Sequence, residues 1–244
     1  MPDGTIAQWG LVFAAFSVAY LIGSIPFAYI IVKSVTGEDV TTHGTGNVGS
    51  MNVRRTTGSW AWFAVAVLGD GFKGLIPTYA AKYIAVGGAG QLALALQPWG
   101  VTLQSIGSDW RASSLVYVPM AAVAGAVVGH NYSCWMALIK RQFARTGKGL
   151  ATGGGALLAY DWRYFVIAVS VALIIIALTR YMMAGQVAAA LSLPVTAVAL
   201  GSPDWPFALL MGSVVYAAHH KRFVGLLRGR EPKLYVNDRM GPRG

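Results

Sequence analysis

The run Leu11–Val32, LVFAAFSVAYLIGSIPFAYIIV, indicates the fold class of this chain. It carries no charged side chain, and a helix needs roughly 20 predominantly apolar residues to cross a bilayer. Similar runs recur as far as Ala218, and the 244 residues are 55% hydrophobic but only 11% charged. This balance is typical of proteins whose solvent is the lipid bilayer. We therefore expect an all-α integral membrane protein that forms a single membrane domain over residues 1–244.

About seven transmembrane helices are predicted from these runs. The span at 147–160 is short and contains three consecutive glycines, so a tilted half-helix or a re-entrant segment is an alternative there. An interfacial segment is expected at 87–113. No cleavable signal is predicted, because the stretch before Leu11 holds Asp3 and no basic residue. The predicted spans lie near 11–32, 60–86, 114–139, 147–160, 164–179, 184–201 and 205–218, and a tail follows at 219–244.

The basic residues predict the orientation of the chain. The positive-inside rule assigns the loops richest in Lys and Arg to the cytoplasm. We expect the N-terminus outside and the C-terminus in the cytoplasm, so that two loops and the tail share the inner face, where the active site is expected. All 19 basic residues then fall on the inner side except four, which are Lys73, Lys82, Arg111 and Arg163.

The first inner loop has the composition of a phosphate cradle. Residues 39–55 read DVTTHGTGNVGSMNVRR. Closely spaced glycines allow successive backbone N–H groups to converge on an anion, while hydroxyl, amide and guanidinium side chains add donors. A flexible loop that meets lipid headgroups is the alternative. The candidate ligands are Gly44, Thr45, Gly46, Asn47, Gly49, Asn52 and Arg55.

The second inner loop predicts another anion site. It ends in Gly147-Lys148-Gly149, and a helix is predicted to begin immediately afterwards. The N–H groups and the positive dipole end at a helix N-terminus attract anions, and the Lys148 ammonium adds a full charge. Thr152 is a further candidate ligand. Positive-inside charges beside a glycine-rich packing helix are the alternative interpretation.

Ionisable residues near or within the spans are the next candidates, since they are costly at membrane depth. Asp70 and Lys73 stand i, i+3 in the second span, where they can neutralise each other on one helix face. We expect them to face the bundle interior, either as a structural pair that orients the first loop or in contact with substrate. His130 and His219 lie near the inner ends of the third and seventh spans, and each is a candidate base or a structural residue.

The sequence argues against several other kinds of site. The nine acidic residues are scattered apart from Glu38 and Asp39, so no carboxylate cluster for a metal ion is predicted. Cys134 is the single cysteine, which excludes a disulfide within the chain and a thiolate cluster. A Gly-x-Ser-x-Gly nucleophile elbow is absent. We expect no metal, no cofactor and no nucleic-acid partner.

Taken in order along the chain, these motifs resemble the bacterial acyl-phosphate-dependent glycerol-3-phosphate acyltransferases, a family of seven-span membrane enzymes. The resemblance extends over nearly the whole chain. It rests on Gly23-Ser-Ile-Pro-Phe-Ala-Tyr29, Gly44-Thr-Gly-Asn-Val-Gly49, Asn52-Val-Arg-Arg55, Asp70-Gly-Phe-Lys-Gly74, Gly129-His130, Gly147-Lys-Gly-Leu-Ala-Thr152, Leu178-Thr-Arg-Tyr181 and Gly229-Arg-Glu-Pro-Lys233.

The resemblance implies an enzyme of phospholipid biosynthesis, an acyltransferase of the bacterial cell (inner) membrane. Such an enzyme transfers a fatty acyl group from acyl phosphate to the 1-hydroxyl of glycerol 3-phosphate, giving lysophosphatidic acid and phosphate. Its partners are those two substrates and the membrane lipids. The resemblance places Arg55 and Lys148 on the phosphate of glycerol 3-phosphate, Thr45 and Asn47 beside the reacting centre, and the glycines of the second loop around the acyl phosphate. The resemblance also implies that His219 completes the site.

Departures from the family pattern leave alternatives open. Thr45 replaces the motif serine, Thr146 replaces a glycine of the second loop, and the tail reads His219-His-Lys221-Arg222 where the family has His-Arg-Glu-Asn. Arg222 is included among the candidate substrate ligands. A divergent relative that acylates another phosphorylated acceptor is one alternative. A non-catalytic lipid- or anion-binding membrane protein, or a transporter, is the other.

Overall fold

The computed structural model describes residues 2–44, 46–95, 111 and 115–231, and the regular elements in those residues are all helices. This confirms the all-α prediction for the described part of the chain. The helices are α1 (Pro2–Gly23), α2 (Phe27–Thr36), the 3-10 helix η1 (Val40–Thr42), α3 (Ser50–Thr57), α4 (Trp60–Ala95), α5 (Tyr117–Asn131), α6 (Cys134–Lys140), α7 (Leu150–Tyr160), α8 (Trp162–Thr179), α9 (Met182–Ala199) and α10 (Trp205–Leu227).

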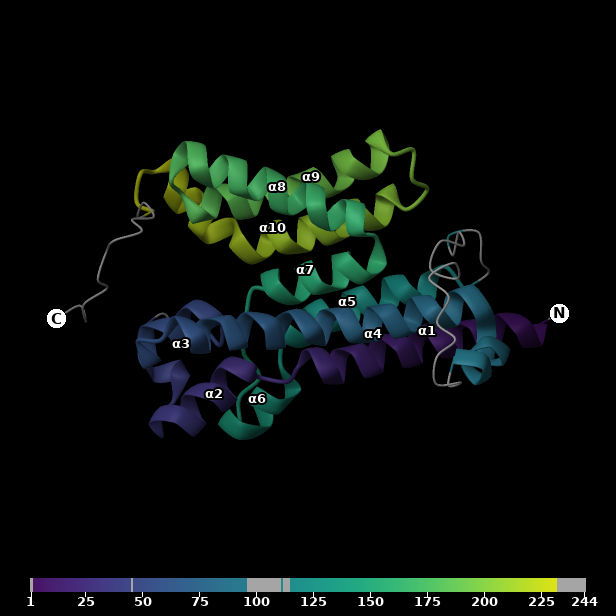
Figure 1. Ribbon diagram of the computed structural model, residues 1–244, viewed down its shortest axis with the longest axis horizontal. Coiled ribbons are helices and arrows are strands. Elements are labelled where there is room, and N and C mark those ends of the chain that lie inside the picture. Colours follow the sequence, from purple (N-terminus) through teal and green to yellow (C-terminus); the bar gives the residue numbers. More distant parts are fainter. Residues whose placement is uncertain (1, 45, 96–110, 112–114, 232–244) are drawn as a thin grey trace.

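The long helices form two groups that lie side by side (Figure 1). In the first group α1 lies along α5 and α4 lies along α7, while in the second α9 contacts both α8 and α10. α7 connects the groups, because it contacts α4, α5 and α8. Met211 of α10 also joins an apolar cluster with Val127 of α5 and Ala156 of α7. The short helices α2, α3 and α6 gather at one end of the first group (Figure 1).

Small residues let these helices approach closely. A Cβ atom at Gly74 of α4 would lie 1.9 Å from the carbonyl oxygen of Thr152, and one at Gly155 of α7 would lie 1.9 Å from a carbonyl oxygen of α4. α1 and α5 meet in the same way, since a Cβ atom at Gly125 would lie 2.3 Å from the Phe16 carbonyl oxygen. Membrane helices associate largely through such close van der Waals packing. The start of α7 is thereby fixed against α4.

Two of the predicted spans are interrupted. The span predicted at 11–32 is divided into α1 and α2, and the one predicted at 114–139 is divided into α5 and α6. Pro26 explains the first break, because proline has no N–H donor and disfavours helix in the residue before it. Residues at the two breaks also form hydrogen bonds with each other. The Ser133 hydroxyl donates to the Ser24 carbonyl oxygen, and the Cys134 N–H donates to Ser24 Oγ at 3.4 Å.

Four stretches are long and apolar enough to cross a membrane by length and composition. α7 and the apolar part of α10, Trp205–Ala217, are shorter, while α4 is long but carries the buried Asp70–Lys73 pair. α4 also continues through the first part of the segment 87–113 that was predicted to be interfacial, and most of the remainder lies outside the described residues. The four stretches are Ile6–Thr36, Tyr117–Lys140, Trp162–Thr179 and Met182–Ala199.

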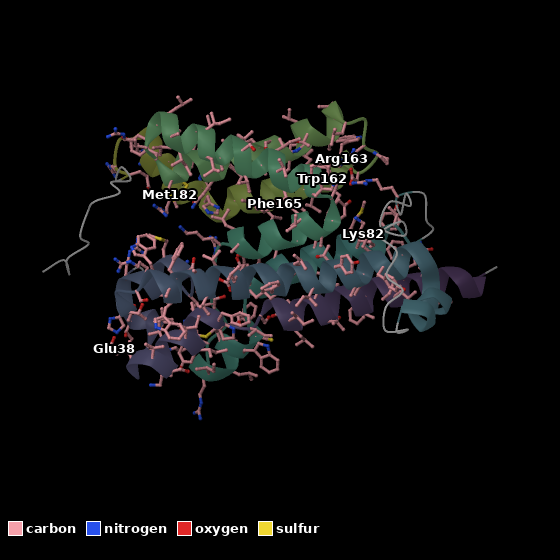
Figure 2. The ribbon with its side chains drawn as sticks, viewed as in Figure 1. Glu38, Lys82, Trp162, Arg163, Phe165 and Met182 are labelled. Carbon is pink, nitrogen blue, oxygen red and sulfur yellow. The ribbon has the colours of Figure 1, made fainter. Side chains whose placement is uncertain are left out.

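The segments predicted to be inner and outer separate to opposite ends of the molecule. Figure 2 shows Glu38 and Met182 at one end and Lys82 and Arg163 at the other. The first of these ends also holds α3, the start of α7 and the end of α10 (Figure 1). At the other end Arg163 Nη2 pairs with Asp161 Oδ2 at 2.7 Å. Both glycine-rich loops therefore lie at the same end of the helices.

Candidate functional site

The first loop is held in shape from inside by Asn52. Its Nδ2 atom donates to the carbonyl oxygens of Val40 (2.8 Å) and His43 (2.9 Å), and the side chain is buried. Gly44 and Gly46 have φ angles of +53° and +69°, a region that favours glycine. A Cβ atom at Gly44 would also lie 2.2 Å from Asn52 Oδ1. Both amide hydrogens of Asn52 therefore hold the loop, and its predicted role as an anion ligand stays a prediction.

Asp39 ties the start of the first loop to the end of α6. Its carboxylate accepts hydrogen bonds from the N–H and the hydroxyl of Thr41 and pairs with Lys140. Burial alone would raise the pKa of Asp39, but the hydrogen bonds from Lys140 and Thr41 outweigh it and lower that pKa to about 2. The loop is thus fixed both by this ion pair and by Asn52.

The second loop opens directly into α7, as predicted. Gly149 has a φ angle of +75° and caps the helix, which begins at Leu150. Gly147 lies against the ring of His130, where a Cβ atom would stand 2.2 Å from Nε2. Glycine is therefore required at 147 by space and at 149 by backbone conformation. Lys148 is held between these two fixed points.

A backbone hydrogen bond joins the two loops. The Val48 N–H donates to the Thr146 carbonyl oxygen at 2.8 Å. Thr146 is in turn fixed to the end of α5, because its N–H donates to the Asn131 carbonyl oxygen and its hydroxyl to the His130 carbonyl oxygen, both at 2.8 Å. The two predicted anion sites therefore form one surface. Thr146 replaces a glycine of the family pattern, and its hydroxyl links the second loop to the end of α5.

Cations from α3, the second loop and α10 converge on this surface. Lys148 is partly buried, and burial, followed by the charges of Arg222 and Arg145 and then of Arg55, lowers its pKa to about 8. Glu231 acts in the opposite direction and raises that pKa. Positive charges that disfavour one another in this way are a feature of anion sites. Arg145 and Glu231 were not among the predicted ligands. Arg145 is close to Lys148 in sequence, whereas the nearness of Glu231 to Lys148 depends on the fold.

His219 lies buried beside the same cations, past the apolar part of α10. Its Nδ1 atom lies 2.8 Å from the Val215 carbonyl oxygen, which accepts a hydrogen bond from it. Burial above all, and then Lys148 and Arg145, lower the pKa of His219 to about 4 despite that hydrogen bond. The ring is therefore neutral at pH 7, and Nε2, which has no hydrogen-bond partner among the described residues, is an available acceptor.

The predicted pair of Asp70 and Lys73 lies beneath the loops. Asp70 Oδ1 and Lys73 Nζ are 2.8 Å apart, and both side chains are buried. Lys73 also donates to the Ile25 carbonyl oxygen at 2.8 Å, at the break between α1 and α2, and His130 Nδ1 lies 3.7 Å from Asp70 Oδ1. The pair thus supports the chain that leads into the first loop and, through His130, the position of Gly147.

The remaining predicted residues include two in the first loop, Asn47 and Gly49, and one in the interior of the helix bundle, Thr152. Asn47 and Gly49 are neighbours in the first loop, since a Cβ atom at Gly49 would lie 3.4 Å from Asn47 Nδ2. Thr152 is fully buried where α7 packs against Gly74, and its role as a ligand stays a prediction. Thr45 lies outside the described residues. Within the described residues there is no group of three or more His, Cys, Asp or Glu side chains placed to hold a metal ion.

Comparison with known proteins gives one consistent result. The family model for glycerol-3-phosphate acyltransferase matches residues 13–229. The glycerol-3-phosphate acyltransferase of Synechococcus sp. (strain JA-3-3Ab) is 35% identical over 217 residues, which cover 88% of this chain and 89% of the relative. That of one strain of Thermus thermophilus is 32% identical over 232 residues, which cover 94% of this chain and 96% of the relative.

Solved structures agree with the sequence comparison. This chain is similar to PlsY, described as an integral membrane glycerol 3-phosphate acyltransferase, in the crystal structure of its glycerol 3-phosphate form. The TM-score is 0.68 at 26% sequence identity, and the match covers 94% of this chain and 96% of PlsY. The lysophosphatidic acid form of PlsY matches with a TM-score of 0.66.

Proposed function

This chain belongs to the glycerol-3-phosphate acyltransferase family, and we propose that the end of the molecule that carries the two loops performs the reaction. The protein is a multi-pass membrane acyltransferase that acylates glycerol 3-phosphate in phospholipid synthesis. The forms in which PlsY was crystallised, with glycerol 3-phosphate and with lysophosphatidic acid, correspond to the acceptor and the product of such a transfer. The donor in this proposal is acyl phosphate.

The hydrogen bond between Val48 and Thr146 is the main support for this proposal, because it joins the two glycine-rich loops. A transfer from acyl phosphate to glycerol 3-phosphate brings two phosphate groups to one reaction centre. Lys148 and Arg55 are proposed to bind the phosphate of the acceptor, with Arg222 adding a third charge from α10. These charges come from separate elements that the fold holds together.

The acyl phosphate is proposed to lie at the N-terminus of α7. The backbone around Gly147 and Gly149 presents N–H groups there, and the helix dipole adds a positive potential. The glycines of the first loop, Gly44, Gly46 and Gly49, line the other side of the same surface in this proposal. Both phosphates then lie within reach of one set of backbone donors and cations.

The transfer itself needs little covalent help from the protein. The 1-hydroxyl oxygen attacks the acyl carbonyl carbon, the bond between that carbon and the phosphate oxygen breaks, and inorganic phosphate leaves with the electron pair. The mixed anhydride is already activated, so positioning and charge stabilisation supply most of the acceleration. The departing phosphate takes up the hydroxyl proton, and the neutral Nε2 of His219 is available to relay it. Thr45 and Asn47 are proposed to stand beside the reacting carbonyl.

We propose seven crossings, by α1, α4, α5, α7, α8, α9 and α10, with the N-terminus outside and the loops in the cytoplasm beneath a bacterial inner membrane. The alternating directions of these helices and the gathering of basic loops at one end support this topology (Figure 1). α7 has 11 residues, which reach only about half the roughly 30 Å of a bilayer core. Its contacts with α4, α5 and α8 shield its ends from lipid in this proposal.

The positive charge of Arg222 is the observation that favours a second candidate function, the acylation of a different phosphorylated acceptor. The family pattern has asparagine at this position, whereas this chain places a guanidinium among other cations. An acceptor with a further anionic group would gain from that charge. Comparison of kcat/KM for glycerol 3-phosphate with that for other phosphorylated alcohols separates the two candidates, because the preferred acceptor has the higher value.

Purified protein supplied with acyl phosphate and glycerol 3-phosphate tests the proposal. We expect lysophosphatidic acid from the wild type, a loss of about 10²-fold or more in Lys148→Ala, since a charge on the acceptor phosphate is removed, and near wild-type activity in Lys33→Ala. Lys33 is a matched control, because it is a basic residue at the same end whose ammonium donates to the Gly37 carbonyl oxygen. An inactive wild type, or a fully active Lys148→Ala, would refute the proposal.

A further inference from the structure

The chain reverses at the end of α10 and brings Glu231 back onto that helix. Gly229 has a φ angle of +68°, which glycine adopts without strain. The Gly229 N–H donates to the Leu226 carbonyl oxygen at 3.0 Å, and the Arg230 N–H donates to the Gly225 carbonyl oxygen at 2.8 Å. These are the hydrogen bonds of a glycine-terminated helix end. They fix the position of the backbone at the next residue, Glu231.

From that position Glu231 binds Arg222 with both carboxylate oxygens. Arg222 Nε donates to Oε1 at 2.9 Å, and Nη2 donates to Oε2 at 2.6 Å. A bidentate pair fixes the plane of the guanidinium as well as its location. The Glu231 side chain is 9% exposed and that of Arg222 is 45% exposed. The carboxylate therefore lies on the protein side of the pair, and the guanidinium keeps an open side.

Arg222 needs such a partner because it stands among like charges. It follows His219 by three residues on α10, so the two share a helix face, and its charge reaches both His219 and Lys148. A flexible arginine facing Lys148 and Arg145 with no counter-charge would be driven outward into water by repulsion. Glu231 opposes that movement.

We propose that Glu231 is a positioning residue for the acceptor, whose carboxylate holds the Arg222 guanidinium at the rim of the cation cluster and offsets part of the positive charge of the cluster. This inference rests on the proposed function, because the cluster is the place proposed for the phosphate of glycerol 3-phosphate. Glu231 touches no reacting atom and acts through Arg222.

The variant Glu231→Gln tests the proposal through the KM for glycerol 3-phosphate. It keeps the size of the side chain and removes its charge, and we expect KM to rise about 2- to 5-fold, the usual effect of a partly exposed ion pair, with kcat nearly unchanged. A pH profile supplies a second readout. Glu231 raises the pKa of Lys148, so its loss moves the alkaline rise of KM to lower pH, whereas Arg222→Gln moves it to higher pH. Among the described residues, the charges that act most on Lys148 are those of Arg222, Arg145, Arg55 and Glu231, and neutral His219 lies beside them.

Glu38→Gln is the matched control, because it makes the same change at the same end of the molecule (Figure 2). Glu38 pairs with His43 at 3.1 Å and is not among the charges that act most on Lys148, so KM and the pH profile are expected to stay as in the wild type. The double variant Arg222→Gln/Glu231→Gln is expected to be no worse than Arg222→Gln alone, since the two residues act as a unit.

A wild-type KM and pH profile in Glu231→Gln, or losses that add in the double variant, would overturn the role of Glu231. Neither result would affect the proposed function, which fails instead if the wild-type protein forms no lysophosphatidic acid. The two failures are therefore distinguishable in one set of assays.

Discussion

Replacing Gly147 with alanine is expected to disable acyl transfer while leaving most of the fold intact. The added Cβ atom would lie 2.2 Å from Nε2 and 2.4 Å from Cδ2 of His130, and 2.9 Å from its carbonyl oxygen. His130 cannot move aside, because its ring is buried and faces Asp70 at 3.7 Å. The turn that carries Lys148 must therefore shift by about 1 Å to reach ordinary contact, and a misplacement of that size costs roughly 10²-fold in rate.

The assay is kcat/KM for lysophosphatidic acid formation, measured together with the thermal unfolding midpoint. Gly153→Ala is the matched control in α7, because its nearest foreign atom, Cγ2 of Val127, would lie 3.8 Å from the new Cβ. Alanine is favoured over glycine in a helix by about 1 kcal/mol, so this control should keep its activity and unfold no earlier than the wild type. Full activity in Gly147→Ala, or an equal loss in Gly153→Ala, would show that close packing at Gly147 does not position Lys148.

Four further outcomes are expected. Asp70→Asn leaves the buried Lys73 without its counter-charge and should lower the unfolding free energy by about 3–5 kcal/mol. Chemical denaturation should show that the double variant Asp70→Asn/Lys73→Met regains most of this loss. Gly155→Ala places a Cβ atom 1.9 Å from an α4 carbonyl oxygen, so thermal unfolding should show a loss of about 1–3 kcal/mol. Asn52→Ala removes two hydrogen bonds within the first loop. We expect the loop to become more mobile, which faster amide exchange or proteolysis at residues 40–44 would detect. The KM for glycerol 3-phosphate should rise as pH increases through about 8, because Lys148 then loses its proton; a KM independent of pH between 7 and 9 would speak against that role.

The helical content and the common end of the two loops follow from local sequence. Apolar runs of bilayer length and the distribution of basic residues are properties of neighbouring residues, and they predict helices and ends directly. The breaks before α2 and before α6 are different. Pro26 marks the first break in the local sequence, but the two breaks are joined by a hydrogen bond between Ser133 and Ser24, which are far apart in sequence, and a continuous apolar run conceals that contact.

The candidate site also combines features that neighbouring residues predict with features that depend on contacts between residues far apart in sequence. The Gly147-Lys148-Gly149 turn and the start of α7 could be predicted, because glycine, charge and helix start are adjacent in sequence. The burial of Thr152 could not, since α4 covers it. The role of Glu231 was equally hidden, because its partner lies on α10 and the two meet only after the chain reverses at a glycine.

In the proposed site the two loops hold two phosphate groups at one reaction centre. Calorimetric titration of glycerol 3-phosphate into protein saturated with a non-transferable acyl phosphonate measures whether both ligands bind together. We predict binding of one glycerol 3-phosphate per chain with the phosphonate still in place, and loss of that binding in Lys148→Ala. Strict displacement of one ligand by the other would contradict the claim.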